Sequence, residues 1–168
     1  QKGQRVYHVD AEGVVIESRF NEAGEQIESI HYVHAISVTT DMDHPGDIAA
    51  LLIETPQDKH TWLVRDNDGR VVHQLNQAGT LAQYKYDAND NIIEKLSYEQ
   101  TITVGGEKTL AGIVTALSNE ALTETLNTQR VQSIFDGNNR EVFTVRENGE
   151  VVETLYNGRN NPISIIEH

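Results

Sequence analysis

The sequence of residues 66–91, DNDGRVVHQLNQAGTLAQYKYDANDN, contains three closely spaced turn signals. The tetrads at 66–69, 76–79 and 87–90 each begin with Asp or Asn, and each precedes a short run containing apolar residues. A short polar side chain at the first position of a type I turn accepts hydrogen bonds from backbone groups two residues further on. The stretch therefore predicts three chain reversals with strands between them.

Five more tetrads of this kind lie outside the stretch, at 10–13, 21–24, 136–139, 146–149 and 157–160. Only the tetrad that starts at Arg146 lacks Asp or Asn at its first position. The fourth position requires a residue that tolerates a positive φ, a conformation that Gly adopts freely and Asn and Asp adopt next best. We therefore expect structural turn positions at Gly13, Gly24, Gly69, Gly79, Asp90, Asn139, Gly149 and Asn160.

The spacing of these positions indicates a repeat. Within each group they recur at every tenth or eleventh position, which leaves room for a strand of ordinary length between turns. They also recur over long distances, because positions 13 and 24 match 79 and 90, and positions 69, 79 and 90 match 139, 149 and 160. The sequence thus predicts a mainly β fold, a repeat array of antiparallel hairpins with one short helix in each long connection. We expect one repeat-containing domain over 1–168, a fragment of a larger protein, with units of about 1–60, 61–129 and 130–168 (incomplete).

The two stretches between the hairpin groups have patterns of their own. Alternating apolar residues predict a long strand over 27–39 and a strand over 91–98 that extends to 104. Helical patterns follow at 48–54, capped by Asp47, and at 110–126. A helix of about two turns is unstable alone, so we expect each to lay its apolar side on the sheet. At the turn of 76–79 we expect valine at Gly79 to destabilise the fold and alanine at Gln77 to have little effect.

Composition excludes several classes of protein. The formal net charge of −13 and the pI near 4.8 argue against nucleic acid and anionic membranes as partners. The chain has no cysteine, so neither disulfides nor thiol chemistry contribute. No apolar run approaches the length of a membrane span. The sequence therefore predicts a protein with no membrane span.

Four of the turn motifs share more than the tetrad. Residues 20–24, 86–91, 135–140 and 156–157 each place an aromatic residue directly before the Asp or Asn that begins the turn. This pattern resembles the YD repeat of the Rhs family. Val9, Arg65, Leu75 and Val145 stand where the aromatic residue is expected. The resemblance implies a segment of a large secreted or surface bacterial protein, in which such repeats wind into a hollow shell around a C-terminal toxic segment, or, in teneurins, form a barrel.

Residues that could carry chemistry form weaker patterns. The loop with Asp41, Asp43 and Asp47 could hold Ca²⁺ through oxygen ligands, although a loop with a helix cap also explains it. His31 and His34, three apart, point to opposite faces of a strand and do not form a metal pair. Trp62, Tyr84 and Tyr86 could form a sugar-stacking surface, but aromatic residues on strands more often pair across strands. We predict no catalytic residue, no metal and no cofactor.

Three functions follow in order of preference. The first is a non-catalytic scaffold whose partners are neighbouring repeats and an encapsulated C-terminal segment or a cell-surface glycan. The second is an adhesin-like module that binds glycan or Ca²⁺ through the loops at 40–47 and 105–117. The third is an enzyme such as a polysaccharide hydrolase, for which we find no Ser, His and carboxylate arrangement.

Overall fold

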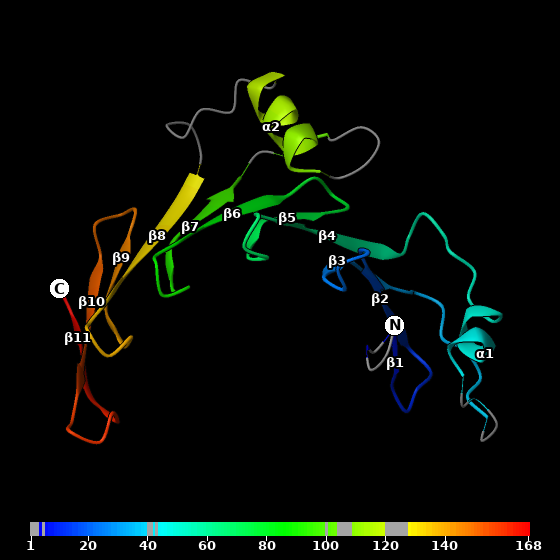
Figure 1. Ribbon diagram of the computed structural model, residues 1–168, viewed down its shortest axis with the longest axis horizontal. Helices are drawn as coiled ribbons and strands as arrows, with labels where there is room; N and C mark the ends of the chain where they lie inside the picture. The colour runs from blue at the N-terminus through cyan, green and yellow to red at the C-terminus, as the bar shows by residue number, and fades with distance from the viewer. Residues whose placement is uncertain are drawn as a thin grey trace.

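The computed structural model describes residue 4 and residues 6–39, 42, 44–99, 101–103, 109–119 and 128–168. Its strands form one antiparallel sheet in chain order, which confirms the predicted array of hairpins. They are β1 (Tyr7–Val9), β2 (Val15–Phe20), β3 (Gln26–His31), β4 (Lys59–Arg65), β5 (Val71–Asn76), β6 (Leu81–Tyr86), β7 (Ile92–Tyr98), β8 (Thr128–Phe135), β9 (Glu141–Arg146), β10 (Val151–Tyr156) and β11 (Pro162–Glu167). The sheet bends into an open arch with β1 towards one end and β11 at the other (Figure 1).

Because each strand reverses direction, the links between strands alternate between two rows of strand ends, which we call rims. The turn rim carries the tetrads at 21–24, 66–69, 87–90, 136–139 and 157–160. The connection rim carries the tetrads at 10–13, 76–79 and 146–149 and the two long connections, 32–58 and 99–127.

The two rims differ in backbone pairing. All five hairpins of the turn rim shift register by one residue next to the turn, between residues 19 and 20, 64 and 65, 85 and 86, 134 and 135, and 155 and 156. The three hairpins of the connection rim pair without a shift. A bulge bends its strand and increases the local twist, so five bulges on one rim favour a curved sheet.

Each long connection carries a helix that covers the sheet, as predicted. Helix α2 (Leu110–Asn119) lies on the convex side of the arch (Figure 1). The core beneath the second connection contains Leu75, Leu81, Leu96, Ile102, Ile113 and Ala116. Beneath the first connection, Ile36, Ile48 and Leu52 pack against Val15, Ile30 and Tyr32. Apolar burial at these two places fixes the connections to the sheet.

A turn glycine anchors each connection to the connection rim. The amide of Ile36 donates to the carbonyl of Gly13 at 2.9 Å, and that of Ile102 donates to Gly79 at 2.8 Å. A β-carbon at Gly13 would lie 2.1 Å from the Ile36 oxygen, and one at Gly79 would lie 2.5 Å from the Ile102 oxygen. Glycine is therefore required at both positions for two reasons, the positive φ and the close approach of the connection.

The strand predicted over 27–39 is too long, whereas β7 matches the strand predicted over 91–98 and only its extension towards residue 104 is not found among the described residues. β3 ends at His31 and β7 ends at Tyr98, while residues 100 and 104 lie outside the described residues. The chain leaves the sheet here but continues to bury apolar side chains, because Tyr32 and Ile36 pack in the first core and Ile102 packs in the second. An alternating pattern cannot distinguish such a segment from a strand that still has a ladder partner.

The first helix also begins earlier than predicted. Helix α1 spans Pro45–Ala49, not 48–54, and its N-cap is His44 and not Asp47. Proline is favoured at the first helical position, because a backbone N–H there would have no acceptor within the helix. Asp47 sits at the third position, where its Oδ2 accepts the His44 amide at 3.0 Å. The part of the second predicted helix beyond residue 119 lies outside the described residues.

The side chain of Gln77, where we expect alanine to have little effect, makes two exposed hydrogen bonds. Its Oε1 accepts the amide of His60 at 3.3 Å, and its Nε2 donates to the Pro56 carbonyl at 2.8 Å. The third unit repeats the first contact, because Glu147 Oε2 accepts the Arg130 amide at 3.2 Å. The second turn residue on this rim therefore ties the end of the connection to the start of the next strand.

Valine at Gly79 and valine at Gly149 separate the two requirements on a connection-rim glycine. Both residues have a φ of 86°, but no described atom lies within 4 Å of a β-carbon at Gly149. Gly149→Val should cost about 1–3 kcal/mol of unfolding free energy from backbone strain alone. Gly79→Val should cost at least about 1 kcal/mol more, because the connection must move. Urea denaturation measures both, and equal losses would contradict the anchoring role of Gly79.

Candidate functional site

All eight predicted turn positions have the left-handed conformation, with φ between 57° at Asn139 and 86° at Gly79 and Gly149. Each amide at this fourth position donates to the carbonyl of the first turn residue, at distances of 2.9 to 3.3 Å. In most of the turns the first side chain also accepts backbone amides; Asp87 Oδ1, for example, accepts from Asn89 at 2.8 Å and Asn91 at 3.0 Å. In the turn that begins with Arg146, the Asn148 side chain accepts the Glu150 amide instead, at 3.0 Å.

A polar cluster joins neighbouring turns of the turn rim. Arg70 reaches its own turn through Asp66 Oδ2, at 2.9 Å from Nε, and the next turn through Asp90 Oδ1, at 3.1 Å from Nη1. Its guanidinium lies 5.3 Å from the centre of the Tyr86 ring, and the Tyr86 hydroxyl donates to the Val71 carbonyl at 2.7 Å. The aromatic residue before one turn thus packs on the arginine that follows the preceding turn.

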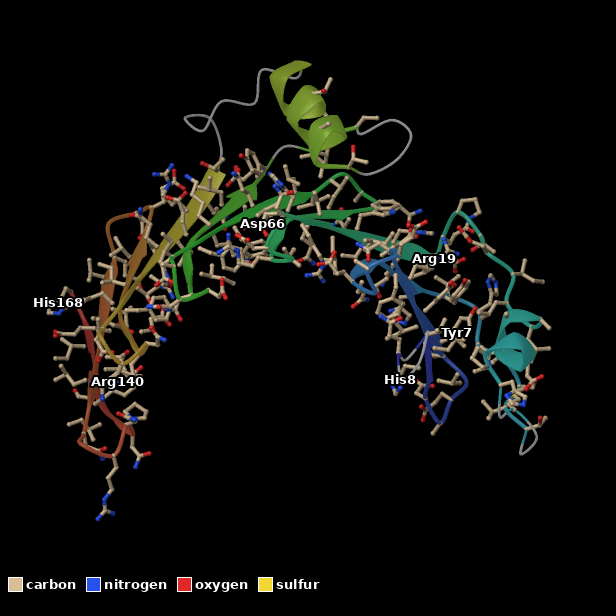
Figure 2. All side chains as sticks on the ribbon, viewed as in Figure 1. Tyr7, His8, Arg19, Asp66, Arg140 and His168 are labelled. Atoms are coloured by element: carbon tan, nitrogen blue, oxygen red, sulfur yellow. The ribbon has the colours of Figure 1, made fainter. Side chains whose placement is uncertain are left out.

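The third unit repeats the cluster, with Arg140 in the place of Arg70. Arg140 Nε donates to Asp136 Oδ2 at 2.8 Å, and Arg140 Nη1 donates to Asn160 Oδ1 at 3.0 Å. The guanidinium lies 4.8 Å from the centre of the Tyr156 ring, and the Tyr156 hydroxyl donates to the Glu141 carbonyl at 2.9 Å. Asp66 and Arg140, one residue from each copy, lie at separate places along the arch (Figure 2).

The residues that depart from the aromatic pattern follow the division into rims. Val9, Leu75 and Val145 precede turns of the connection rim, where this cluster is not built. Arg65 precedes a turn of the turn rim. Its Nε donates to the Gln26 carbonyl at 3.1 Å, the same kind of hydrogen bond that the tyrosine hydroxyl makes in the other units. The motif with the aromatic residue is therefore a motif of one rim. Counting the strand connections along the sequence and separating the odd from the even ones could have shown this division between the rims.

The rims also account for the three turns that lack glycine at the fourth position. Asp90, Asn139 and Asn160 all lie on the turn rim, and each side chain accepts a hydrogen bond from the preceding turn of that rim. Asn91 supplies the donor for Asn139, at 3.2 Å. At Gly69 the space is taken, because the Glu25 carboxylate lies 2.7 Å from where a β-carbon would be. We call this row of contacts between successive turns the rim ladder.

A second cluster of charges lies on the helix-covered face, between β2, β3 and β4. Arg19 binds the carboxylates of Glu17 at 2.9 Å, Glu28 at 3.2 Å and Glu54 at 3.1 Å. Glu28 also contacts His60 Nδ1 at 2.8 Å. Burial together with the hydrogen bond that the Tyr32 hydroxyl donates to Glu17, at 2.6 Å, raises the pKa of Tyr32 well above its ordinary value. The carboxylates face the Arg19 guanidinium and the His60 ring, so ion pairs and hydrogen bonds join the strands here.

The remaining predicted candidates are not brought together. Asp41 and Asp43 lie outside the described residues, and Asp47 accepts the amide of His44, the N-cap of α1. No group of three possible metal ligands occurs in the described part of the chain, His31 and His34 included. Trp62 faces the covered side through its pairing with Leu75, whereas Tyr84 lies on the opposite face, so the two do not form one sugar-stacking surface. None of the helices among the described residues is long and apolar enough to cross a membrane.

The geometry therefore supports an assembly of backbone and side chains that holds successive hairpins in register. Its donors and acceptors are engaged with one another along the turn rim. Local hydrogen bonds within each turn fix the backbone, and the rim ladder sets how one hairpin lies beside the next.

A double-mutant cycle tests the rim ladder. Arg140→Ala and Asn160→Gly remove the two partners, and glycine keeps the positive φ of residue 160. We expect a coupling free energy of about 0.5 kcal/mol in urea denaturation, typical of an exposed pair with good geometry. Arg140→Ala combined with Asn148→Ala on the other rim should be additive. A coupling free energy of zero between residues 140 and 160 would show that the contact contributes nothing to stability.

Asp136→Asn tests the charge in the cluster. Hydrogen bonds from the Arg140 side chain lower the pKa of Asp136 below its ordinary value. A carboxyl with a lowered folded pKa contributes stability above its unfolded pKa and loses it as the pH falls through the folded value. Unfolding followed between pH 7 and pH 2 should therefore show a smaller loss in acid for Asp136→Asn than for the parent chain. Asn already serves at the first position of the turn in Asn21 and Asn157, so the turn itself should persist. Parallel acid profiles would refute this contribution.

No family model matches this chain, and no curated protein matches it. Among solved structures, it is similar to the crystal structures of TcdB2-TccC3-Cdc42 and of TcdB2-TccC3, with a TM-score of 0.59 and identities of 14% and 15%. It is also similar to TcdB2-TccC3 without the hypervariable C-terminal region, with a TM-score of 0.56 and 10% identity. Each likeness covers 99% of this chain and 7% of the other chain.

At these identities the likeness shows the fold. The chain spans about 7% of the length of the chains that it matches. It has the fold of a segment of the TcdB2-TccC3 structures, which is the fold that the resemblance to the Rhs/YD-repeat family led us to expect.

Proposed function

We propose that this chain is a non-catalytic structural segment of a large secreted or surface Rhs/YD-type protein, where it forms part of an extended β shell. One observation carries the proposal. The described strands form a single curved sheet in chain order, and the likeness to TcdB2-TccC3 extends over 99% of the chain. A segment of this kind acts through its shape, and its partners are the neighbouring repeats of the parent protein.

The chemistry of the two faces supports a shell wall. The convex side carries α2, and the connections cover the apolar side chains of that face in the first two units. The opposite face includes rows of hydroxyl side chains, since Ser18 pairs with Ser29, Ser29 with Thr61, and Ser133 with Thr144, although Ile165 is also exposed there. Short hydroxyl side chains remain hydrated without a covering layer. The concave side would then face the interior of the shell, where an enclosed C-terminal segment of the parent protein would lie.

Two binding assays and one scattering measurement test this function. We expect no saturable response on a glycan array, and a melting temperature that shifts no more with Ca²⁺ than with Mg²⁺. Small-angle X-ray scattering should fit an open arch rather than a compact globule. A saturable glycan signal, or a Ca²⁺-specific rise in melting temperature that Asp47→Ala abolishes, would favour the adhesin-like module. An enzymatic activity that is lost when one carboxylate is changed, as in Glu28→Gln, would overturn both the scaffold function and the adhesin-like module.

A further inference from the structure

The third unit repeats the surface that the connections cover in the first two. In the alignment of the turn positions, Val151 occupies the place of Val15 and Leu81, and Ile166 that of Ile30 and Leu96. The four residues of the first two units are at most 1% exposed. Val151 is half-buried and Ile166 is 36% exposed. The floor of a third core is therefore built, and no described segment covers it.

The glycine that anchors a connection is also present. Gly149 has the φ of 86° found at Gly79, and it lies on the same rim. At Gly13 and Gly79 the oxygen of an isoleucine lies within 2.5 Å of an added β-carbon, whereas no described atom lies within 4 Å of one at Gly149. Among the described residues, no amide is found on the Gly149 carbonyl that would correspond to Ile36 or Ile102.

The chain enters this surface on the path of the first unit. The amide of Tyr32 donates to the Val15 carbonyl at 3.0 Å, and that of His168 donates to Val151 at 2.9 Å. His168 Nε2 lies 3.3 Å from Glu153 Oε2, as the Tyr32 hydroxyl lies on Glu17. Figure 2 shows His168 at the end of the arch away from Tyr7 and His8. His168 thus takes the place of Tyr32 and Tyr98, four residues before the anchoring isoleucines.

We propose that Gly149, Val151 and Ile166 form an acceptor surface for a third connection. Its occupant is an extended segment with a branched apolar residue four positions after the place of His168, followed by a short amphipathic helix. The apolar residue donates its amide to Gly149 and covers Val151, and the helix covers Ile166. The inference rests on the proposed function, because the next repeat of the array supplies the segment.

This occupant fits the surface better than a second copy of the chain does. A strand from another copy would pair along the free side of β11, the last strand of the sheet. Such pairing satisfies backbone groups in the plane of the sheet but leaves its convex face uncovered. Covering Ile166 and reaching Gly149 on the rim requires a segment that crosses the face, as the described parts of the two long connections do in the first two units.

An extended chain tests the proposal. Residues 99–119 are appended directly after His168, so that the second copy of Ile102 falls four residues beyond His168. We expect the unfolding equilibrium constant in water to fall at least tenfold relative to the parent chain, measured in urea. Inserting one glycine after His168 shifts the register and should remove the gain. Gly149→Val should destabilise the extended chain more than it destabilises the parent chain, because it also removes the gain from the appended segment. Gly137→Ala, in an open turn of the other rim, should leave that gain in place.

Two results would overturn the proposal. One is an equal gain in the register-shifted chain, or no gain in any extended chain. The other is a dimer of the unextended chain in sedimentation that Ile166→Asp dissociates, which would make a second copy the occupant. Neither result changes the glycan and calcium measurements, so a failure of this inference is distinguishable from a failure of the scaffold function.

Discussion

The left-handed residue that closes each hairpin is the constraint on which the rest of this structure depends. It lets the chain reverse after each short strand, and the two rims use it in different ways. On the connection rim its carbonyl is what the next element binds, so at Gly13 and Gly79 a side chain would occupy the space that the connection needs. On the turn rim its side chain is itself an acceptor, so Asp90, Asn139 and Asn160 replace glycine. One backbone conformation therefore has two residue preferences, each set by the neighbouring element.

Local features of the chain could be predicted from the sequence because they depend on few residues. A turn requires one acceptor at its first position and one residue of positive φ at its fourth, and both can be recognised without knowledge of the fold. The ends of β3 and β7 could not be predicted in this way. The side chains of Tyr32 and Ile36 pack against the core whether or not a partner strand lies beside them. Only the hydrogen bond to the Gly13 carbonyl shows where the segment docks.

The candidate site could be predicted in part. The tyrosine before the turn was visible as a motif, but its partner Arg70 belongs to the preceding turn of the same rim, with a whole hairpin between them in the sequence. Such contacts depend on the distance between neighbouring hairpins, which a bulge at each turn of the rim helps to set. The alternation of hairpins between two rims was already implied by an antiparallel sheet in chain order. Sorting the tetrads by parity would have separated the motif with the aromatic residue from the motif without it.

Comparison of the three units shows which interactions the backbone requires. The glycines of the connection rim and the apolar floor persist at residues 149, 151 and 166, where no described segment covers them. The charge cluster of the covered face does not persist, because Leu155 and Ser164 stand where Arg19 and Glu28, and Lys85 and Glu94, form ion pairs. Paired charges at this depth gain little net free energy over uncharged residues, so losing both partners together costs little. The connection-rim glycine remains in all three units, at residues 13, 79 and 149, and at the first two a β-carbon would clash with the connection.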